Sequence, residues 1–399
     1  MYSQSFSPRN LYACAYQGEL RDSKLSKVDF IRVVDACVGN SINEGSYRFK
    51  IRKSQELYLN AHPKGGVERL CQDLILRKLY CNIKRIYGVE QADRNHIVKQ
   101  MISLLKEETR KWVIRLDVKH FYESIDRRRL VRRFKEDGRL TYQSIQLLEN
   151  LFNQIEDIDK IEMNGLPRGL SISSVMSELY MKYFDLDVCR MDGVFYYARF
   201  VDDIIIFCNS QKTLDCTWRK IPGMLEEMGL KLNESKSYIW DNERKSVNLT
   251  YLGYKFIPKG SMDVDVAIAE KKVNVIKTRL TRSFVRFAND GNFDMLKDRV
   301  KYLTGNITFK SRSTLLPIKV GIHFNYKYVT EKTALLDLDM YYQRLLHCRV
   351  GRLGAKLASR MTAAQRSQLE KYSFVFGFER HVNHYFLPAR IADIKSCWR

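Results

Sequence analysis

Residues 195–208 read FYYARFVDDIIIFC, and this stretch predicts two apolar strands joined by a tight turn. Aromatic and β-branched residues on both sides of the turn favour a hairpin with both arms buried. The turn carries two adjacent acids, Asp202 and Asp203. Carboxylates at such a tip can hold a hard divalent cation such as Mg²⁺ through oxygen. The alternative is a solvated hairpin tip, because Asp also favours turns through local hydrogen bonds.

A third acid lies upstream, in residues 112–126, which read WVIRLDVKHFYESID. Trp112 to Leu116 predict a buried strand, and Asp117 stands at its end. An acid at that end can face the hairpin tip when the two strands are neighbours in a sheet. Two-metal phosphoryl transfer uses acids on neighbouring strands to hold two cations about 3.5–4 Å apart. The alternative role of Asp117 is to cap the helix that follows.

Between these two segments, residues 164–184 read NGLPRGLSISSVMSELYMKYF. A Gly-Leu-Pro-Arg-Gly loop leads into a predicted helix whose apolar positions are Ile172, Val175, Met176, Leu179 and Tyr180. Glycine lets a backbone approach a nucleotide closely, and a helix N-terminus favours phosphate. The alternative is an ordinary loop before a Ser-rich helix start.

Two further segments follow, GLKLNESKSYIW at 229–240 and LTYLGYKF at 249–256. In order and spacing, the five segments together resemble motifs A to E of the reverse transcriptase family. The Asp117 strand resembles motif A, GLPRGLSISS motif B, FVDD motif C, GLKLNESKS motif D, and YLGY the primer-grip motif E. The resemblance covers about residues 60–257 and implies a nucleotidyltransferase, an RNA-directed DNA polymerase.

The resemblance also implies roles for individual residues. Asp117, Asp202 and Asp203, with the backbone carbonyl of Val118, would hold two Mg²⁺ ions, for which Mn²⁺ can substitute. Lys236 resembles the motif D lysine that protonates or neutralises the departing pyrophosphate. A lysine in a polar turn can instead be merely solvated.

Further implied contacts are to the nucleotide and the primer. Tyr122 resembles the steric gate that rejects a ribose 2′-hydroxyl, and its alternative role is a core aromatic beside Phe121. HPKGGVERL at 62–70 resembles the fingers hairpin. By this match the nucleotide-binding residues are Lys64, Arg69, Tyr122, Arg168 and Gly169, and the primer-grip residues are Leu252 and Gly253.

Two positions depart from the family pattern. Arg168 stands where Gln is usual and Phe200 where Tyr is frequent, so contacts to the templating base pair and the primer end are expected to differ from those of retroviral enzymes. PRGLSISS, FVDD and DRNHIVKQMISLL at 93–105 are most similar to bacterial defence-associated enzymes of the unknown-group and abortive-infection kinds. Retron and group II intron enzymes are nearer relatives than retroviral ones.

Charge distinguishes the C-terminal third from the rest of the chain. The 399 residues carry a formal charge of +22, and residues 266–399 hold 25 Lys and Arg against 10 Asp and Glu. A predicted helix opens this region with an apolar stripe of Val273, Ile276, Leu280, Phe284 and Phe287. A second stripe comprises Lys272, Arg279, Arg282 and Arg286. We expect the first stripe to be buried and the second to bind nucleic-acid phosphates, although a solvated charged face is the alternative. A second helical stretch is predicted near 333–358.

The predicted fold is α+β, the right-hand polymerase fold with fingers, an antiparallel palm with helices, and a helical basic thumb. Residues 1–50 are predicted to be a helical extension, 51–257 fingers and palm, and 258–399 the thumb and C-terminal nucleic-acid-binding region. The start MYSQSFSPRN lacks an apolar signal core, and no stretch is long enough to span a membrane. Nine cysteines without a Cys-x-x-Cys pair fit reduced thiols in a cytoplasm, which the resemblance implies is bacterial.

These features predict an enzyme that takes dNTPs and an RNA template to a DNA product. By resemblance the template is a dedicated noncoding RNA and the setting antiphage defence, with a homo-oligomer or a second defence protein as further partners. Alternatives are a template-independent polymerase of the abortive-infection kind and a group II intron or retron-type enzyme. A catalytically silent RNA-binding protein is a further alternative, against which the three intact acids argue.

Overall fold

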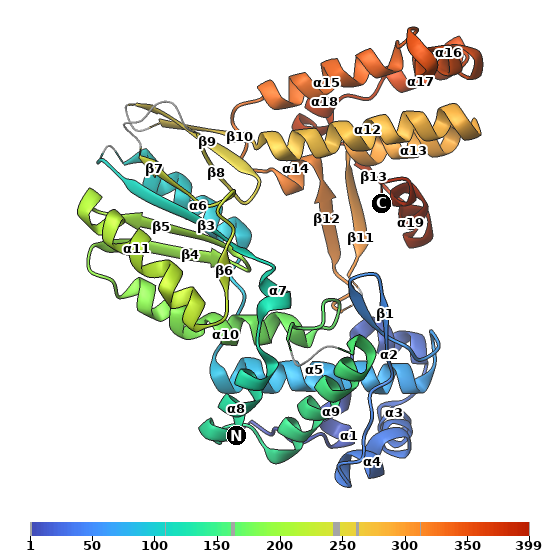
Figure 1. Cartoon of the computed structure of the whole chain (residues 1–399). Coiled ribbons are helices and arrows are strands. Elements are labelled where there is room, and N and C mark those ends of the chain that lie inside the picture. The colour runs from blue at the N-terminus through green and yellow to red at the C-terminus, as the bar shows by residue number, and fades with distance from the viewer. Residues whose placement is uncertain are drawn as a thin grey trace. The chain divides into compact units, whose positions relative to one another are not determined.

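The computed structural model describes residues 2–107, 109–160, 164–241, 248–260, 263–311 and 313–398. Its internal contacts divide the chain into two compact units (Figure 1). The first comprises residues 1–97, 110–244 and 312–314, and the second comprises 98–109, 245–311 and 315–399. Both mix helices with antiparallel strands, which confirms the predicted α+β class. The assignment of fingers, palm and thumb stays a prediction, as do the domain boundaries at 50 and 257.

The first unit contains a five-stranded antiparallel sheet. Its strands are β3 (Trp112–Lys119), β4 (Val194–Phe200), β5 (Asp203–Cys208), β6 (Lys231–Leu232) and β7 (Tyr238–Asp241). The order is β4-β5-β3, and β3 then pairs with β7 along Trp112–Arg115 and with β6 at Val118–Lys119. The predicted hairpin and the predicted strand before Asp117 are both present. The strand runs past Asp117 to Lys119 because β6 pairs with its last residues.

Two helices, α10 (Ile172–Cys189) and α11 (Gln211–Glu227), contact each other and the sheet. All five predicted apolar positions of α10 are buried. The prediction that both hairpin arms are buried is right for β5 but wrong for β4, where Phe195 is 47% exposed. The reason is the sheet order, because β4 lies at the edge and has a neighbour on one side only.

Helices form the rest of the first unit. The central one, α5 (Val67–Tyr87), buries Leu74, Ile75 and Leu79 among other residues. The unit also contains further helices and a two-stranded hairpin. They are α1 (Pro8–Tyr12), α2 (Gln17–Ser23), α3 (Lys27–Val34), η1 (Asp35–Gly39), α4 (Asn40–Asn43), β1 (Ile51–Ser54), β2 (Leu57–Asn60), α7 (Phe121–Ser124), α8 (Arg127–Asp137) and α9 (Tyr142–Asp159). Helices thus cover most of residues 8–43.

The second unit begins with a three-stranded sheet ordered β10-β9-β8 and a pair of helices. Their bounds are β8 (Leu249–Tyr251), β9 (Tyr254–Gly260), β10 (Asp263–Ile268), α12 (Glu270–Asp290) and α13 (Phe293–Thr304). The predicted apolar stripe of α12 is buried throughout. The predicted cationic stripe on the same helix is exposed. The helix α6 (Arg94–Lys106) starts in the first unit and ends in the second.

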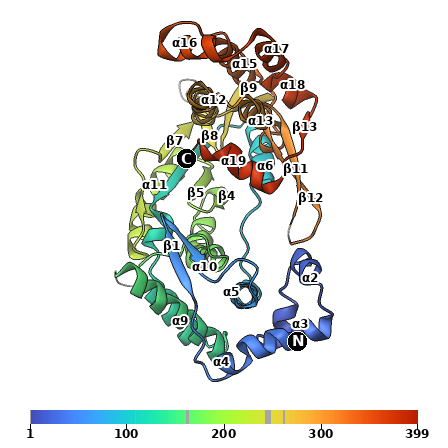
Figure 2. The same ribbon diagram turned by 90° about the vertical axis from the view of Figure 1, so that its right-hand side faces the viewer.

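Further helices and strands complete the second unit, and most of them contact α12 or α13. They are β11 (Asn306–Lys310), β12 (Pro317–Gly321), α14 (Ile322–Asn325), α15 (Thr333–Leu346), α16 (Gly351–Arg360), α17 (Ala363–Glu370), α18 (Phe374–Glu379), β13 (Asn383–His384) and α19 (Pro388–Ser396). The helical stretch predicted near 333–358 is thus two helices. Figures 1 and 2 show α19 and the β11–β12 hairpin on the same side of the α12–α13 pair. No helix in the described ranges is long and apolar enough to cross a bilayer.

Candidate active site

Two of the three predicted acids lie directly opposite each other in the sheet. In the antiparallel pairing of β3 with β5, Asp117 is the partner of Asp203. Opposed residues in such a pair point to the same face, with Cβ atoms about 4.5–5.5 Å apart. The two carboxylates therefore converge on one side of the sheet, at the end of the β4–β5 hairpin.

The third acid, Asp202, lies in the turn between β4 and β5. Its carbonyl oxygen accepts a hydrogen bond of 3.1 Å from the backbone N–H of Val118, so the turn is tied to β3. The other turn residue, Val201, has a φ of 61°. A β-branched side chain rarely adopts this left-handed conformation, which marks a strained turn held by its surroundings.

Arg199 is one part of those surroundings. Its guanidinium donates a 3.1 Å hydrogen bond to the Val201 carbonyl, and it also pairs with Glu178 at 2.6 Å and Asp185 at 2.7 Å, both on α10. The Arg199 side chain is only 4% exposed. A buried cation with two carboxylate partners fixes β4 and its turn to the helix beneath.

Two cations lie against the acids. Lys236 Nζ is 3.0 and 3.1 Å from the two carboxylate oxygens of Asp117, and the Asn233 side chain donates to the same carboxylate at 2.9 Å. Arg115 donates to Asp203 at 3.2 Å. The sequence analysis identified Lys236 but missed Asn233 and Arg115. For Arg115 a signal was present. Arg115 and Asp117 are two residues apart on one strand, and this period of two puts their side chains on the same face of the sheet.

Burial is the main cause that raises the pKa of Asp202 and of Asp203 above the usual aspartate value. Repulsion from neighbouring carboxylates adds to the rise, whereas Arg115 opposes it at Asp203. Burial and crowding make the ionised form of these acids unfavourable, and a divalent cation bound between them would offset that cost. Mg²⁺ takes oxygen ligands of this kind. Among the described residues, however, no three acid, histidine or cysteine side chains are already gathered as a metal site.

The loop before α10 joins three segments. The N–H groups of Gly165 and Leu166 donate to the carbonyls of Ile125 and Tyr122, at 2.9 and 2.7 Å. On its other side, the Arg168 carbonyl accepts from Tyr58 of β2 at 2.7 Å. Gly169 has a φ of 97°, and a Cβ there would lie 2.8 Å from the Tyr58 carbonyl oxygen. Only glycine fits this approach to the β2 backbone. The predicted contact of Gly169 with the nucleotide stays a prediction.

Residues 68–256, which contain all of this geometry except Tyr58, match the family of reverse transcriptase, RNA-dependent DNA polymerase. The chain is similar to that family over these residues, which are somewhat less than half of its length. The match supports the resemblance at the level of the family, and with it the predicted enzyme class, a nucleotidyltransferase. No curated protein matches the chain.

Among solved structures, this chain is similar to telomerases from two yeasts. Apo telomerase from Candida tropicalis truncated from its C-terminal domain is 18% identical with a TM-score of 0.39, over 59% of this chain and 60% of that one. Telomerase from Candida albicans in complex with the TWJ fragment of telomeric RNA is 12% identical with a TM-score of 0.39, over 76% and 55%. This chain thus spans less than two thirds of either structure, and likeness this remote adds nothing to the argument from the sheet.

Within the residues that match the reverse transcriptase family, Tyr122 is held on two sides. Its carbonyl is bonded to Leu166, and the Arg168 guanidinium lies 5.4 Å from the centre of its ring. Arg168 in turn forms a two-contact ion pair with Glu123, at 2.5 and 3.0 Å. Glu123 was missed by the sequence analysis, although it stands next to Tyr122. The ion pair places the residue that departs from the family's Gln beside the predicted steric gate.

The remaining predicted nucleotide-binding and primer-grip residues lie on separate segments of the chain. Lys64 is exposed, and Arg69 Nη1 donates to the carbonyls of Asn60 and His62 at 3.0 Å each. Leu252 and Gly253 form the turn between β8 and β9 in the second unit, with φ angles of 48° and 84°. Positive φ at both positions is typical of a two-residue hairpin turn.

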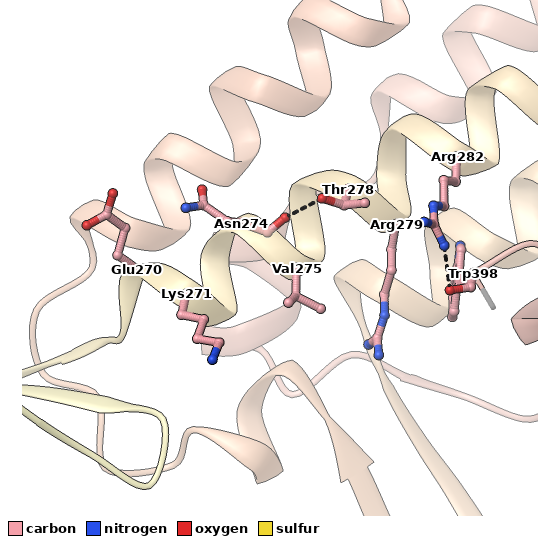
Figure 3. A pocket seen from close by; sticks show the side chains of 8 residues that line it. All are labelled: Glu270, Lys271, Asn274, Val275, Thr278, Arg279, Arg282 and Trp398. Atoms are coloured by element: carbon pink, nitrogen blue, oxygen red, sulfur yellow. Dashed lines mark hydrogen bonds between the residues drawn. The ribbon is translucent and has the colours of Figure 1, made fainter. Parts of the chain in front are cut away.

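The cationic stripe of α12 lies in the second unit. Lys272, Arg279, Arg282 and Arg286 are all exposed. Arg282 donates to the Trp398 carbonyl at 2.8 Å, and Arg286 pairs with Asp290 at 2.9 Å. Figure 3 shows Arg279 and Arg282 on α12 with Trp398 beside them.

Proposed function

We propose that this protein is an RNA-directed DNA polymerase that joins deoxynucleotides to a primer or protein hydroxyl. The observation that carries the proposal is the cross-strand pairing of Asp117 with Asp203 beside the Asp202 turn, inside the residues that match the reverse transcriptase family. Asp117, Asp202 and Asp203, with the Val118 carbonyl, are the proposed ligands of two Mg²⁺ ions, with Mn²⁺ as an alternative. When bound, such ions favour ionisation of the attacking hydroxyl and stabilise the charge on departing pyrophosphate.

The chain's own side chains have further proposed roles around the acids. Lys236, which contacts Asp117, is close enough to the acids to neutralise or protonate the pyrophosphate. Tyr122 is the proposed sugar selector. Arg168, Gly169, Lys64 and Arg69 are proposed to contact the nucleotide, and Leu252 with Gly253 the primer.

The proposed template is RNA, held partly by the exposed cations of α12. The large basic surplus of residues 266–399 supports phosphate contacts of this kind. A dedicated noncoding RNA, a role in bacterial antiphage defence and a cytoplasmic location are supported by the motif resemblance alone. The second candidate function is synthesis without a template, which the same resemblance to abortive-infection enzymes supports.

Primer extension tests both candidates. Purified protein is given Mg²⁺, dNTPs and a DNA primer annealed to a short RNA, and then the same mixture without the RNA. Synthesis that requires RNA and copies it supports the first candidate, whereas an equal product without RNA supports the second. Loss of product in Asp117→Asn, but not in the exposed control Asp157→Asn, would link either activity to the paired acids.

A further inference from the structure

The second unit contains a cavity of about 760 Å³ between α12, α13, the β11–β12 hairpin, α14 and α19. This volume lies within the roughly 300–1,000 Å³ of small-molecule sites. Apolar and aromatic side chains form most of its wall. The aromatic members are Tyr302, Phe309, Tyr326, Tyr385 and Phe386. Tyr385 is 73% exposed, so an aromatic ring stands at the surface where solvent would favour a polar residue.

The charges around the cavity have one sign. Arg279, Lys310 and Lys395 line it, and the lining contains no Asp or Glu among the residues that the structure describes. Lys395 Nζ lies 5.4 Å from the centre of the Tyr302 ring, so a cation already lies against an aromatic face in this wall. Flat apolar walls with cations at the rim match a ligand that is aromatic and anionic. Nucleotides combine these two properties.

A groove on α12 shares one lining residue with the cavity. It has a volume of about 610 Å³, and Arg279 lines both the groove and the cavity. Figure 3 shows Lys271, Val275 and Arg279 projecting from one side of α12, with Arg282 next to Trp398. The groove lining includes the acid Glu270 at the helix start, away from the end that Arg279 shares with the cavity. A phosphate backbone that followed this groove would reach Arg279, which also lines the cavity.

We infer that the second unit binds an unpaired nucleotide of single-stranded nucleic acid, with its base in the cavity and its backbone along Lys271, Arg279 and Arg282. Sequence-tolerant stacking on aromatic side chains together with a basic track is how single strands are commonly held. A base inside a duplex is paired and stacked, so it cannot enter. The inference rests on the proposed function only in taking nucleic acid as the partner, and it uses none of the acids of the first unit.

Fluorescence anisotropy of the full chain tests the site without synthesis, since no dNTPs are present. The probes are a labelled 12-nucleotide RNA, the DNA of the same sequence, and each annealed to its complement. Tyr385→Ala should weaken binding of the single strand about tenfold by loss of one stacking partner, and leave the duplex unchanged. Lys395→Gln should lower the salt dependence of single-strand binding by about 0.7 in log–log slope.

Matched controls lie outside the cavity and the groove. Phe376→Ala removes an aromatic side chain that is 54% exposed on α18, and Lys327→Gln removes an exposed cation. Both should bind like the unaltered chain. Filling the cavity with Ile391→Trp provides a second test, because it should exclude the base while every cation stays in place.

Changing the nucleic acid instead of the protein gives an independent measurement of the same contact. Single abasic positions are scanned through the 12-mer, and one register should lose about as much affinity as Tyr385→Ala, with no further loss when both are combined. The inference is overturned if Tyr385→Ala and Ile391→Trp bind normally, or if single strand and duplex weaken equally. Stronger binding of RNA than of DNA would identify the partner as RNA. Primer extension, measured separately, can fail while this binding persists, or the reverse.

Discussion

The paired acids of the first unit and the cations of α12 in the second are both concentrations of like charge, but the structure holds them in different ways. Asp117 is buried, and its carboxylate contacts Lys236 and Asn233. Arg279 on α12 is exposed and reaches its position on a long side chain. Reacting atoms must be placed within fractions of an ångström, whereas phosphate contacts tolerate adjustment. The two regions therefore should respond differently to the loss of one charge.

The largest expected effect is at the acids. Asp203→Asn should reduce primer extension by roughly 10⁴-fold, about 5.4 kcal/mol in the barrier, because a metal-binding charge is lost. Thermal unfolding should show a folded protein of similar stability. Asp157→Asn, an exposed acid on α9, is the control. Extension within tenfold of normal by folded Asp203→Asn protein would contradict the proposed metal site.

Substitution of Arg199 tests how much the buried ion pairs beneath the turn stabilise the fold. Arg199→Gln should lower the free energy of unfolding by about 3–5 kcal/mol, since Glu178 and Asp185 lose their buried counter-ion. Urea titration measures this loss, and Arg190→Gln, an exposed arginine at the end of α10, gives the reference. A loss below 1 kcal/mol would show that solvent compensates the two acids.

Tyr122 should change selectivity rather than rate. Tyr122→Val should raise the use of ribonucleotides relative to deoxynucleotides by about 10- to 100-fold, because the clash with the 2′-hydroxyl is removed. Competing single-nucleotide incorporations give the ratio. Tyr142→Val, at a tyrosine that is 77% exposed, should leave it unchanged. An unchanged ratio in Tyr122→Val would make Tyr122 a packing residue.

The α12 stripe should show the smallest effect per residue. Neutralising Lys272, Arg279, Arg282 and Arg286 to Gln should weaken binding to any sequence and flatten its salt dependence, by up to about 0.9 in slope per lost duplex contact. Stability should change by no more than about 0.5 kcal/mol for each exposed position. The control removes four exposed cations from the first unit, Arg9, Lys24, Lys27 and Arg32. Equal weakening by both sets would show attraction by net charge alone.

The sequence predicted the elements of the site better than its contacts. Nearly continuous apolar runs identified β5 and most of β3, since burial of a strand leaves a local pattern. Exposure of Phe195 was not predictable in this way, because it depends on which strand lies at the edge of the sheet. Likewise Glu123 and Arg168 are 45 residues apart in sequence, and nothing local in either segment announces their ion pair.

Selection for heat resistance and selection for DNA synthesis should favour different residues at the position of Val201. A β-branched residue in a left-handed conformation costs about 1–3 kcal/mol, so a glycine there would relieve the backbone and raise the thermal stability of the chain. The same glycine would let the turn sample other conformations and move Asp202. Variants selected for heat resistance alone should therefore accumulate glycine or asparagine at this position, and variants selected for synthesis should keep a side chain that restricts the turn.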